Sequence, residues 1–217
     1  MAQTQPDGYL ALPATGTGSA VLVLHAWWGL NSVIRAFCDR LAEAGFVAFA
    51  PDLYHGKVTD QIADAEQLAS ALDTRVDQAR ADLAAAVSFL KARAGSDSAG
   101  MAVIGFSLGA FFALDLSASA PDDIRSVVLF YGSGPADFSR SKADYLAHFA
   151  EHDPYEPQSN VDALAEALRR ARRPATFYQY DGVGHWFFEA DRRQAYDPAA
   201  ASLAWERTLA FLRRGAG

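Results

Sequence analysis

The amino-acid sequence predicts a single α/β domain with a doubly wound, mostly parallel β-sheet that helices cover on both faces. Apolar runs of strand length alternate along the chain with stretches of helical periodicity, which is typical of a parallel sheet between two layers of helices. The length of 217 residues is usual for one domain, so we expect residues 1–217 to form one domain. In such sheets, ligands bind beyond the carboxyl ends of the strands. The segments that follow strands are therefore where functional residues are expected.

The expected strands are apolar on consecutive residues, as strands buried on both faces are. They cover residues 20–25, 46–50, 101–106, 126–131, 145–149 and 175–180. The expected helices combine good helix formers with regularly spaced apolar positions. They cover residues 60–72, 76–94, 108–119, 160–172 and 199–213. A further helix is capped by Asn31 and runs to about residue 44, where Gly45 ends it.

Composition and charge exclude several classes of function. Acidic residues outnumber basic residues by 26 to 19, and the resulting net charge of −7 argues against a nucleic-acid or anionic-membrane partner. Cys38 is the only cysteine, so no intramolecular disulfide can form. Residues 1–8 lack the basic segment and apolar core of a signal peptide, and apolar runs such as residues 20–24 are too short to cross a bilayer. We therefore expect a cytoplasmic protein.

The strongest motif is the sequence GFSLG at residues 105–109, which matches the G-x-S-x-G pattern of a nucleophile elbow. It lies between an expected strand and an expected helix, as the motif does in an α/β-hydrolase fold. The turn is so tight that side chains beside the serine would collide, and the hydroxyl projects toward the free N–H groups of the helix. We therefore predict Ser107 as a nucleophile, with an ordinary tight turn as the alternative.

A serine hydroxyl needs a base, and in this fold the chain order is serine, acid, histidine. Of the five histidines, only His185 follows the last expected strand, in a loop that two glycines allow to bend; a surface histidine is the alternative. Asp153 is the acid we favour, because it follows a late strand in a turn that two prolines stiffen. Asp137 and Asp181 remain alternatives.

Four stretches of the chain resemble the dienelactone hydrolase family in order and spacing. They are residues 28–31 (WGLN), 51–54 (PDLY), 105–109 (GFSLG), and 184–185 (GH) with the later 196–200 (YDPAA). The resemblance implies an α/β-hydrolase fold, with Asp153 at the acid position of the family and His185 at its base position. It also implies an oxyanion hole formed by the backbone N–H groups of Trp27 and Leu108, in agreement with the general requirement for two such donors.

The chain departs from the founding dienelactone hydrolases in the residues that surround this site. It has Ser107 in place of their cysteine, and Ala26 in place of a glutamate. These changes agree, because a carboxylate can control the ionisation of a thiol but has nothing to control beside a hydroxyl. Glu189 stands where the family has a substrate-binding arginine, and residues 60–71 contain no second arginine. We therefore expect small neutral esters or lactones to be better substrates than the anionic dienelactone.

The predicted function is hydrolysis of a small ester or lactone through an acyl-enzyme, by a monomer or small homo-oligomer. The candidate pocket residues are Trp28, Tyr54, Trp186 and Glu189. No His/Cys cluster has metal-ligand spacing and no dinucleotide motif precedes a helix, so neither a metal nor a cofactor is expected. A thioesterase or peptidase with the same triad is an alternative, as is a non-catalytic binding protein on a hydrolase scaffold.

Overall fold

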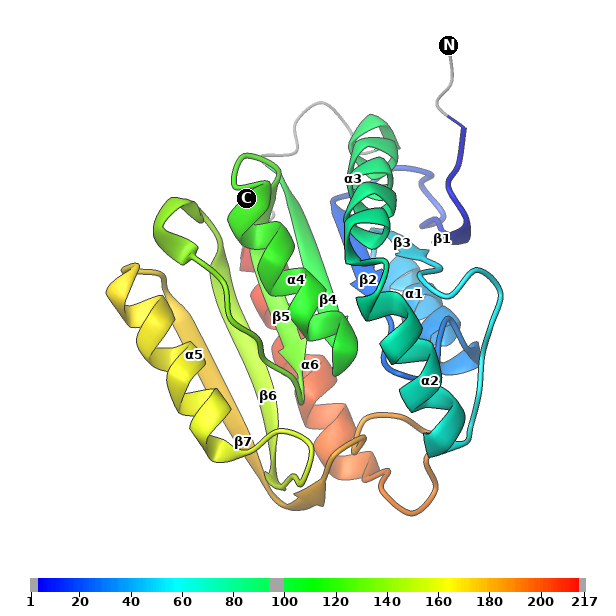
Figure 1. The fold of residues 1–217 in the computed structure, drawn as a ribbon. Helices are drawn as coiled ribbons and strands as arrows, with labels where there is room; N and C mark the ends of the chain where they lie inside the picture. The colour runs from blue at the N-terminus through cyan, green and yellow to red at the C-terminus, as the bar shows by residue number, and fades with distance from the viewer. Residues whose placement is uncertain (1–3, 94–99, 215–217) are drawn as a thin grey trace. The chain divides into compact units, whose positions relative to one another are not determined.

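Residues 4–93 and 100–214 are described by a computed structural model of the chain (Figure 1). Within these ranges the chain forms seven strands and six α-helices, and the strands belong to one mostly parallel sheet. The α/β class expected from the sequence is therefore confirmed. The chain divides into two compact units, Met1–Met101 and Ala102–Gly217. That residues 1–217 form one domain stays a prediction.

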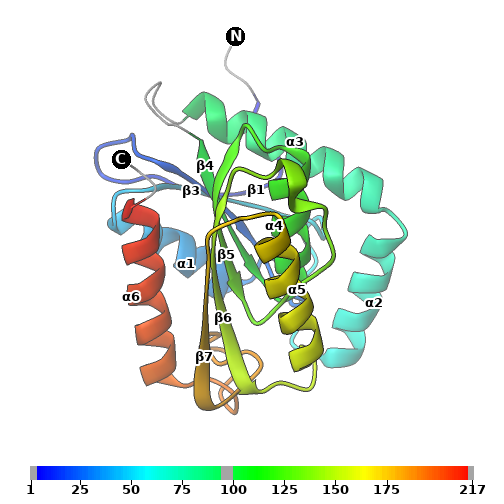
Figure 2. The ribbon, with the colours of Figure 1, turned by 90° about the vertical axis from the view of Figure 1, so that its left-hand side faces the viewer.

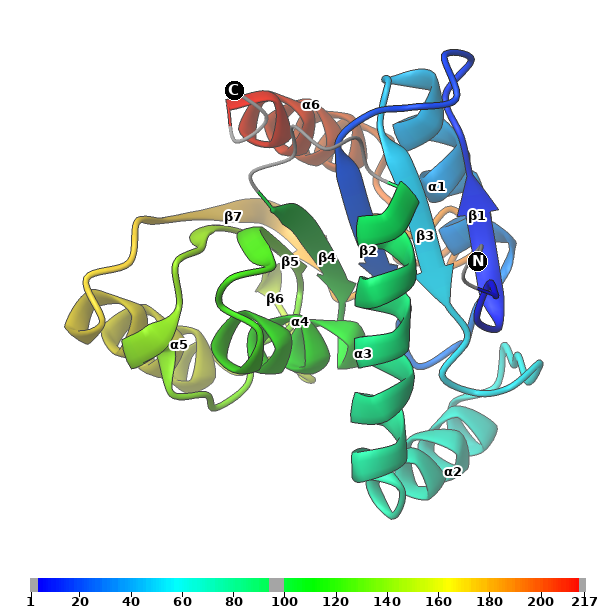
Figure 3. The ribbon, with the colours of Figure 1, turned by 90° about the horizontal axis from the view of Figure 1, so that it is seen from above.

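The first unit contains three strands in the order β1-β3-β2. They are β1 at Gly8–Ala11, β2 at Ala20–Leu24 and β3 at Val47–Pro51. β1 runs antiparallel to β3, whereas β2 runs parallel to it. The helices of this unit are α1 at Ser32–Glu43, α2 at Ile62–Asp73 and α3 at Val76–Arg93. Figure 3 shows α1 and α3 on opposite faces of these strands, and every residue of β2 and β3 is buried.

The ends of α1 follow the signals expected from the sequence. The side chain of Asn31 caps the helix by accepting a hydrogen bond from the backbone N–H of Ile34 at 3.1 Å. Gly45 follows the helix with a φ of 97°, the left-handed conformation that commonly ends helices. The predicted end of α3, Ala94, lies outside the described residues.

The second unit contributes the strands β4, β5, β6 and β7, in that order across the sheet. They cover Met101–Phe106, Ile124–Phe130, Asp144–His152 and Ala175–Gly184. The helices are α4 at Leu108–Ser119, α5 at Gln158–Arg170 and α6 at Pro198–Arg214, with a short 3-10 helix at Phe138–Arg140. Figure 2 shows α4 and α5 on one face of these strands and α6 on the other. Because β5, β6 and β7 are parallel, their carboxyl ends lie at one edge of the sheet.

Two features of the sheet differ from the sequence-based expectation. The sequence gives no signal for β1, because this strand has only four residues, begins at a glycine and is only partly buried. β6 and β7 extend beyond their apolar runs to His152 and Gly184, and the pairing register shifts between Ala150 and His152. Such an irregularity lets strands continue into polar sequence and re-aims the side chains that follow.

Candidate active site

Ser107 occupies a strained turn between β4 and α4. Its φ of 48° and ψ of −112° lie in a region that non-glycine residues rarely adopt. The backbone N–H of Ser107 donates to the carbonyl of Phe130 at 2.9 Å, which ties the turn to the end of β5. A Cβ added at Gly105 would lie 2.4 Å from the carbonyl oxygen of Gly109, so this position of the turn requires glycine. The turn therefore has the geometry of a nucleophile elbow.

His185 lies between the Ser107 hydroxyl and the Asp153 carboxylate. Its Nε2 is 3.0 Å from Ser107 Oγ, and its Nδ1 is 2.7 Å from Asp153 Oδ2. A carboxylate can only accept, so Nδ1 carries the proton and donates it to Asp153. Nε2 of the neutral ring is then the acceptor for the Ser107 hydroxyl. The side chains of His185 and Asp153 are 4% and 5% exposed, so little water competes for this hydrogen bond.

Asp153 is held rigidly in the turn that follows β6. Its Oδ1 accepts hydrogen bonds from the backbone N–H groups of Tyr155 and Glu156, both at 2.9 Å. Of the two alternative acids, Asp137 caps the 3-10 helix through the N–H of Ser139, and Asp181 lies exposed within β7. The structure therefore brings Asp153 to the histidine.

Aromatic rings surround the imidazole of His185. The ring centroids of Tyr131, Tyr155 and Trp186 lie 4.9, 5.1 and 5.1 Å from that of His185. Trp186, a predicted pocket residue, is partly exposed and has a positive φ of 68°. Sequence reasoning missed Tyr131, because the apolar run of residues 126–131 identifies this tyrosine only as the last residue of a buried strand. Its place at the carboxyl end of that strand is the signal that was available.

Gly132 approaches the nucleophile more closely than any other residue type could. A Cβ added there would lie 2.6 Å from the carbonyl oxygen of Ser107 and 2.8 Å from the Cβ of Ala110. Leu108 is the first residue of α4, so its N–H has no acceptor within that helix. This free N–H is the predicted oxyanion donor of the elbow.

Three further predicted site residues, Trp27, Trp28 and Tyr54, lie in the first unit. Trp27 follows β2, and its role as the second oxyanion donor stays a prediction. The predicted pocket residues Trp28 and Tyr54 are both buried, with exposed fractions of 1% and 3%. His25 has a structural role, because its Nε2 accepts from the N–H of Leu53 at 3.2 Å and burial lowers its pKa.

The sequence predicts Glu189 as a pocket residue, but its side chain does not reach the surface of the protein. Its side chain is fully buried, and burial raises the pKa of its carboxyl group to about 8. At neutral pH the group is therefore mostly uncharged. Its Oε1 instead accepts a hydrogen bond from the hydroxyl of Tyr131 at 2.8 Å. Sequence alone could not reveal this, because glutamate is rarely buried without a charged partner.

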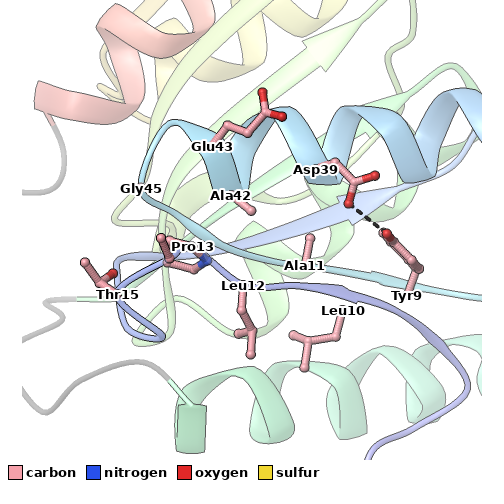
Figure 4. A pocket seen from close by; sticks show the side chains of 11 residues that line it. Tyr9, Leu10, Ala11, Leu12, Pro13, Thr15, Asp39, Ala42, Glu43 and Gly45 are labelled. Atoms are coloured by element: carbon pink, nitrogen blue, oxygen red, sulfur yellow. Dashed lines mark hydrogen bonds between the residues drawn. The ribbon is translucent and has the colours of Figure 1, made fainter.

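The first unit also carries a groove of about 600 Å³ between β1 and α1 (Figure 4). Residues 9–15 line one side of it, and Asp39, Ala42, Glu43 and Gly45 line the other. The Tyr9 hydroxyl donates to Asp39 at 2.7 Å. None of the predicted site residues lines this groove, so we assign it no part in the chemistry.

Residues 4–93 and 100–214 contain no group of three or more His, Cys, Asp or Glu side chains placed to hold a metal ion. Over the same ranges, no helix is both long and apolar enough to span a membrane.

The site contains a hydroxyl, an imidazole and a carboxylate that are hydrogen-bonded in series, and each follows a strand of a mostly parallel sheet. This arrangement is typical of an α/β hydrolase. The sequence pattern of the dienelactone hydrolase family matches residues 7–215. The chain therefore belongs to the dienelactone hydrolase family, and it is a hydrolase of carboxylic esters or lactones.

Individual relatives cover nearly the whole chain. "Protein usf" of Aquifex pyrophilus is 35% identical over 213 residues, which are 95% of this chain and 92% of that protein. A Bradyrhizobium protein named "Probable 2-oxo-3-(5-oxofuran-2-ylidene)propanoate lactonase" is 34% identical, covering 94% of this chain and 88% of that protein. A Klebsiella pneumoniae structure assigned to the dienelactone hydrolases is 28% identical and superposes with a TM-score of 0.79, covering 93% of this chain and 89% of that one.

Proposed function

We propose that Ser107 is the nucleophile of a Ser-His-Asp triad that hydrolyses small esters or lactones through an acyl-enzyme. The observation that carries this proposal is the unbroken hydrogen-bond series from Ser107 Oγ to His185 Nε2 at 3.0 Å and from His185 Nδ1 to Asp153 Oδ2 at 2.7 Å. Geometry of this kind lets a weakly acidic hydroxyl lose its proton only as it attacks.

In the first half-reaction, Ser107 Oγ forms a bond to the carbonyl carbon while His185 Nε2 takes the hydroxyl proton. The imidazolium that forms is stabilised by Asp153, which also fixes the tautomer of the ring. When the tetrahedral intermediate collapses, the carbon–oxygen bond to the alcohol breaks and His185 returns the proton to that alcohol. In a lactone, the released alcohol stays attached to the acyl chain.

In the second half-reaction, water replaces the alcohol. His185 accepts a proton from the water as it attacks the acyl-enzyme, and then returns a proton to Ser107 Oγ. In both halves the negative charge on the carbonyl oxygen needs backbone donors. Leu108 at the start of α4 supplies one, and the family resemblance suggests Trp27 for the other. These steps use no metal and no cofactor.

The substrate class follows from the same site. One relative is named a lactonase, which supports a lactone as the scissile group, although the compound in its name is a carboxylate. The neutral charge of the substrate is inferred from position 189 of this chain, which lacks the arginine that would hold a carboxylate. We therefore propose small neutral esters or lactones as substrates, acted on in the cytoplasm by a monomer or small homo-oligomer. Comparing kcat/KM for an aryl ester, a lactone, an aryl thioester and a peptide anilide tests this class. A preference for the thioester or the anilide would contradict it.

The nucleophile is tested by Ser107→Ala, with Ser119→Ala as the matched control in the same helix region. Ser119 lies at the end of α4 and bonds only locally, to the carbonyl of Asp115. We expect Ser107→Ala to lose roughly 10⁶-fold in kcat for p-nitrophenyl acetate, as other triads do, while Ser119→Ala keeps the wild-type rate. Substantial turnover by folded Ser107→Ala would contradict the proposal.

A further inference from the structure

Glu189 is a buried carboxyl group that the proposed mechanism does not use. Its side chain is fully buried, Oε1 accepts one hydrogen bond from Tyr131, and Oε2 has no hydrogen-bond partner among the described residues. Burial without a second partner favours the uncharged form, and it raises the pKa of the group to about 8. Such a group is costly to keep, so its position calls for a functional explanation.

Tyr131 connects this carboxyl group to the proposed base. Its hydroxyl donates to Glu189 Oε1 at 2.8 Å, and its ring packs 4.9 Å from the ring of His185. Burial, reinforced by Glu189, raises the pKa of the Tyr131 phenol well above its ordinary value, so the hydroxyl stays a donor. The ring of Tyr131 therefore lies against the imidazole while its hydroxyl is anchored elsewhere.

Tyr131 is also connected to the nucleophile through the backbone. It has a φ of 37° and donates its N–H to the carbonyl of His148 at 2.8 Å. The preceding residue, Phe130, accepts the backbone N–H of Ser107. A displacement of Tyr131 would therefore disturb both the imidazole and the turn that carries the hydroxyl.

Glu189 belongs to the loop that carries His185. The N–H of Glu189 donates to the carbonyl of Trp186, and the N–H of Arg192 donates to the carbonyl of Glu189, both at 2.9 Å. The loop is thus bonded within itself, and the Tyr131–Glu189 hydrogen bond fastens it to the end of β5. A loop residue such as His185 needs a fixed neighbour of this kind to hold a catalytic distance.

We propose that Tyr131 and Glu189 form a positioning pair that holds the His185 ring in line with Ser107, and that the pair works with Glu189 uncharged. The inference rests on the proposed function of Ser107 and His185. Loss of the hydrogen bond frees the Tyr131 ring to shift against the imidazole and lowers the rate of proton transfer. A charge on Glu189 strengthens the bond to Tyr131 but leaves Oε2 as a buried anionic oxygen without a partner, which favours opening of the loop that carries His185 and lowers the same rate. Neither residue contacts the reacting atoms, so substrate affinity is expected to change little.

The pH dependence follows from the groups that face Glu189. From the end of β5 it faces the neutral phenol of Tyr131, and within its own loop it faces Asp191, which opposes its ionisation, and Arg192, which favours it. Asp191 and Arg192 also pair with each other at 3.2 Å, and His185 lies beyond the Tyr131 ring. Because the pKa of Glu189 is about 8, the wild-type kcat should decline above that pH.

The experiment compares three substitutions with the wild type over pH 6–10. Tyr131→Phe keeps the ring but removes the hydroxyl, and should lower kcat about tenfold with KM nearly unchanged. Glu189→Gln keeps an acceptor oxygen and cannot ionise, so it should retain most of the kcat and lose the decline above pH 8. At pH 9.5 the wild type should fall about tenfold or more relative to its plateau, and Glu189→Gln less than twofold.

Tyr145→Phe is the matched control, because it removes another buried hydroxyl, which bonds to Ser117 and Ser141 away from the triad. It should leave kcat within about twofold of the wild type. An equal loss in Tyr145→Phe and Tyr131→Phe would overturn the proposal, since it would show a general effect of deleting a buried hydroxyl. So would superimposable pH profiles of the wild type and Glu189→Gln, a test that does not depend on Tyr131→Phe folding.

Labelling by a fluorophosphonate separates this inference from the proposed function. Wild-type protein that is not labelled at Ser107 would defeat the proposed function itself. A second outcome is that the wild type is labelled at Ser107 and that Tyr131→Phe is labelled at the same rate and has the same kcat. This outcome would contradict only the positioning pair.

Discussion

At the scale of single residues, the site depends on hydrogen bonds that restrict the rotation of its side chains. Asp153 accepts two backbone N–H groups on Oδ1, and the His185 N–H lies within hydrogen-bond distance of both of its oxygens, so the carboxylate cannot rotate without losing a bond. Chain order and flanking prolines were enough to favour it over Asp137 and Asp181. The burial of Glu189 was not predictable, because it depends on packing around Tyr131 that one sequence does not display.

The first prediction concerns Asp153, with exposed Asp181 as the matched control. Asp153→Asn should lower kcat roughly 10⁴-fold at neutral pH, because an amide can donate to the imidazole and favour the wrong tautomer. Asp181→Asn should have no effect, since Asp181 lies exposed in β7. Steady-state rates on an aryl ester check both variants. If Asp181→Asn were inactive and Asp153→Asn active, the acid would have been assigned to the wrong residue.

At the scale of secondary-structure elements, the strands were predictable because a parallel sheet covered on both faces needs consecutive apolar residues. β2, β3 and β4 show this in full, since every residue of each is buried. β1 was not predictable, because a short edge strand needs no such run. The polar ends of β6 and β7 were missed because they too lack a run of apolar residues. These ends place Asp153 and His185. Motif order predicted the three residues that the structure brings together in the candidate site, whereas strand apolarity did not predict how far the strands reach.

The second prediction concerns His148, which joins three elements of the second unit. From β6 its ring bonds to the Tyr180 hydroxyl of β7 at 2.8 Å and to Thr208 Oγ1 of α6 at 3.0 Å. Burial, and then the charge of Arg207, lowers its pKa to about 3 from an ordinary 6.5. Between those values the unfolded chain binds more protons than the folded chain, so stability falls as the pH drops below 6.5.

The comparison is between the wild type and His148→Gln, which can keep hydrogen bonds but cannot take up a proton. From pH 7 to pH 4, the free energy of unfolding of the wild type should fall by up to about 3 kcal/mol more than that of the variant. Urea unfolding at several pH values measures the difference. Parallel pH dependence in the two proteins would show that His148 is not held neutral.

At the scale of the whole molecule, the proposed chemistry relies on side chains and backbone N–H groups of this chain. Ser107, Asp153 and His185 all belong to the second unit, Ala102–Gly217. Cys38, the only cysteine of the chain, is buried in α1 of the first unit, and burial raises the pKa of its thiol. A buried thiol of raised pKa is a poor nucleophile. The chain therefore belongs to the dienelactone hydrolase family, but its candidate nucleophile is a serine and not its cysteine.

The most direct measurement of the central claim is mapping of a covalent adduct. The folded wild type is treated separately with a fluorophosphonate and with iodoacetamide, and activity, intact mass and peptide masses are recorded. We expect one phosphonyl adduct, located on Ser107, to abolish hydrolysis, while iodoacetamide leaves activity unchanged. Ser107→Ala should take up no phosphonyl group. An adduct on another residue, or loss of activity on alkylation of Cys38, would contradict the assignment of Ser107 as the nucleophile.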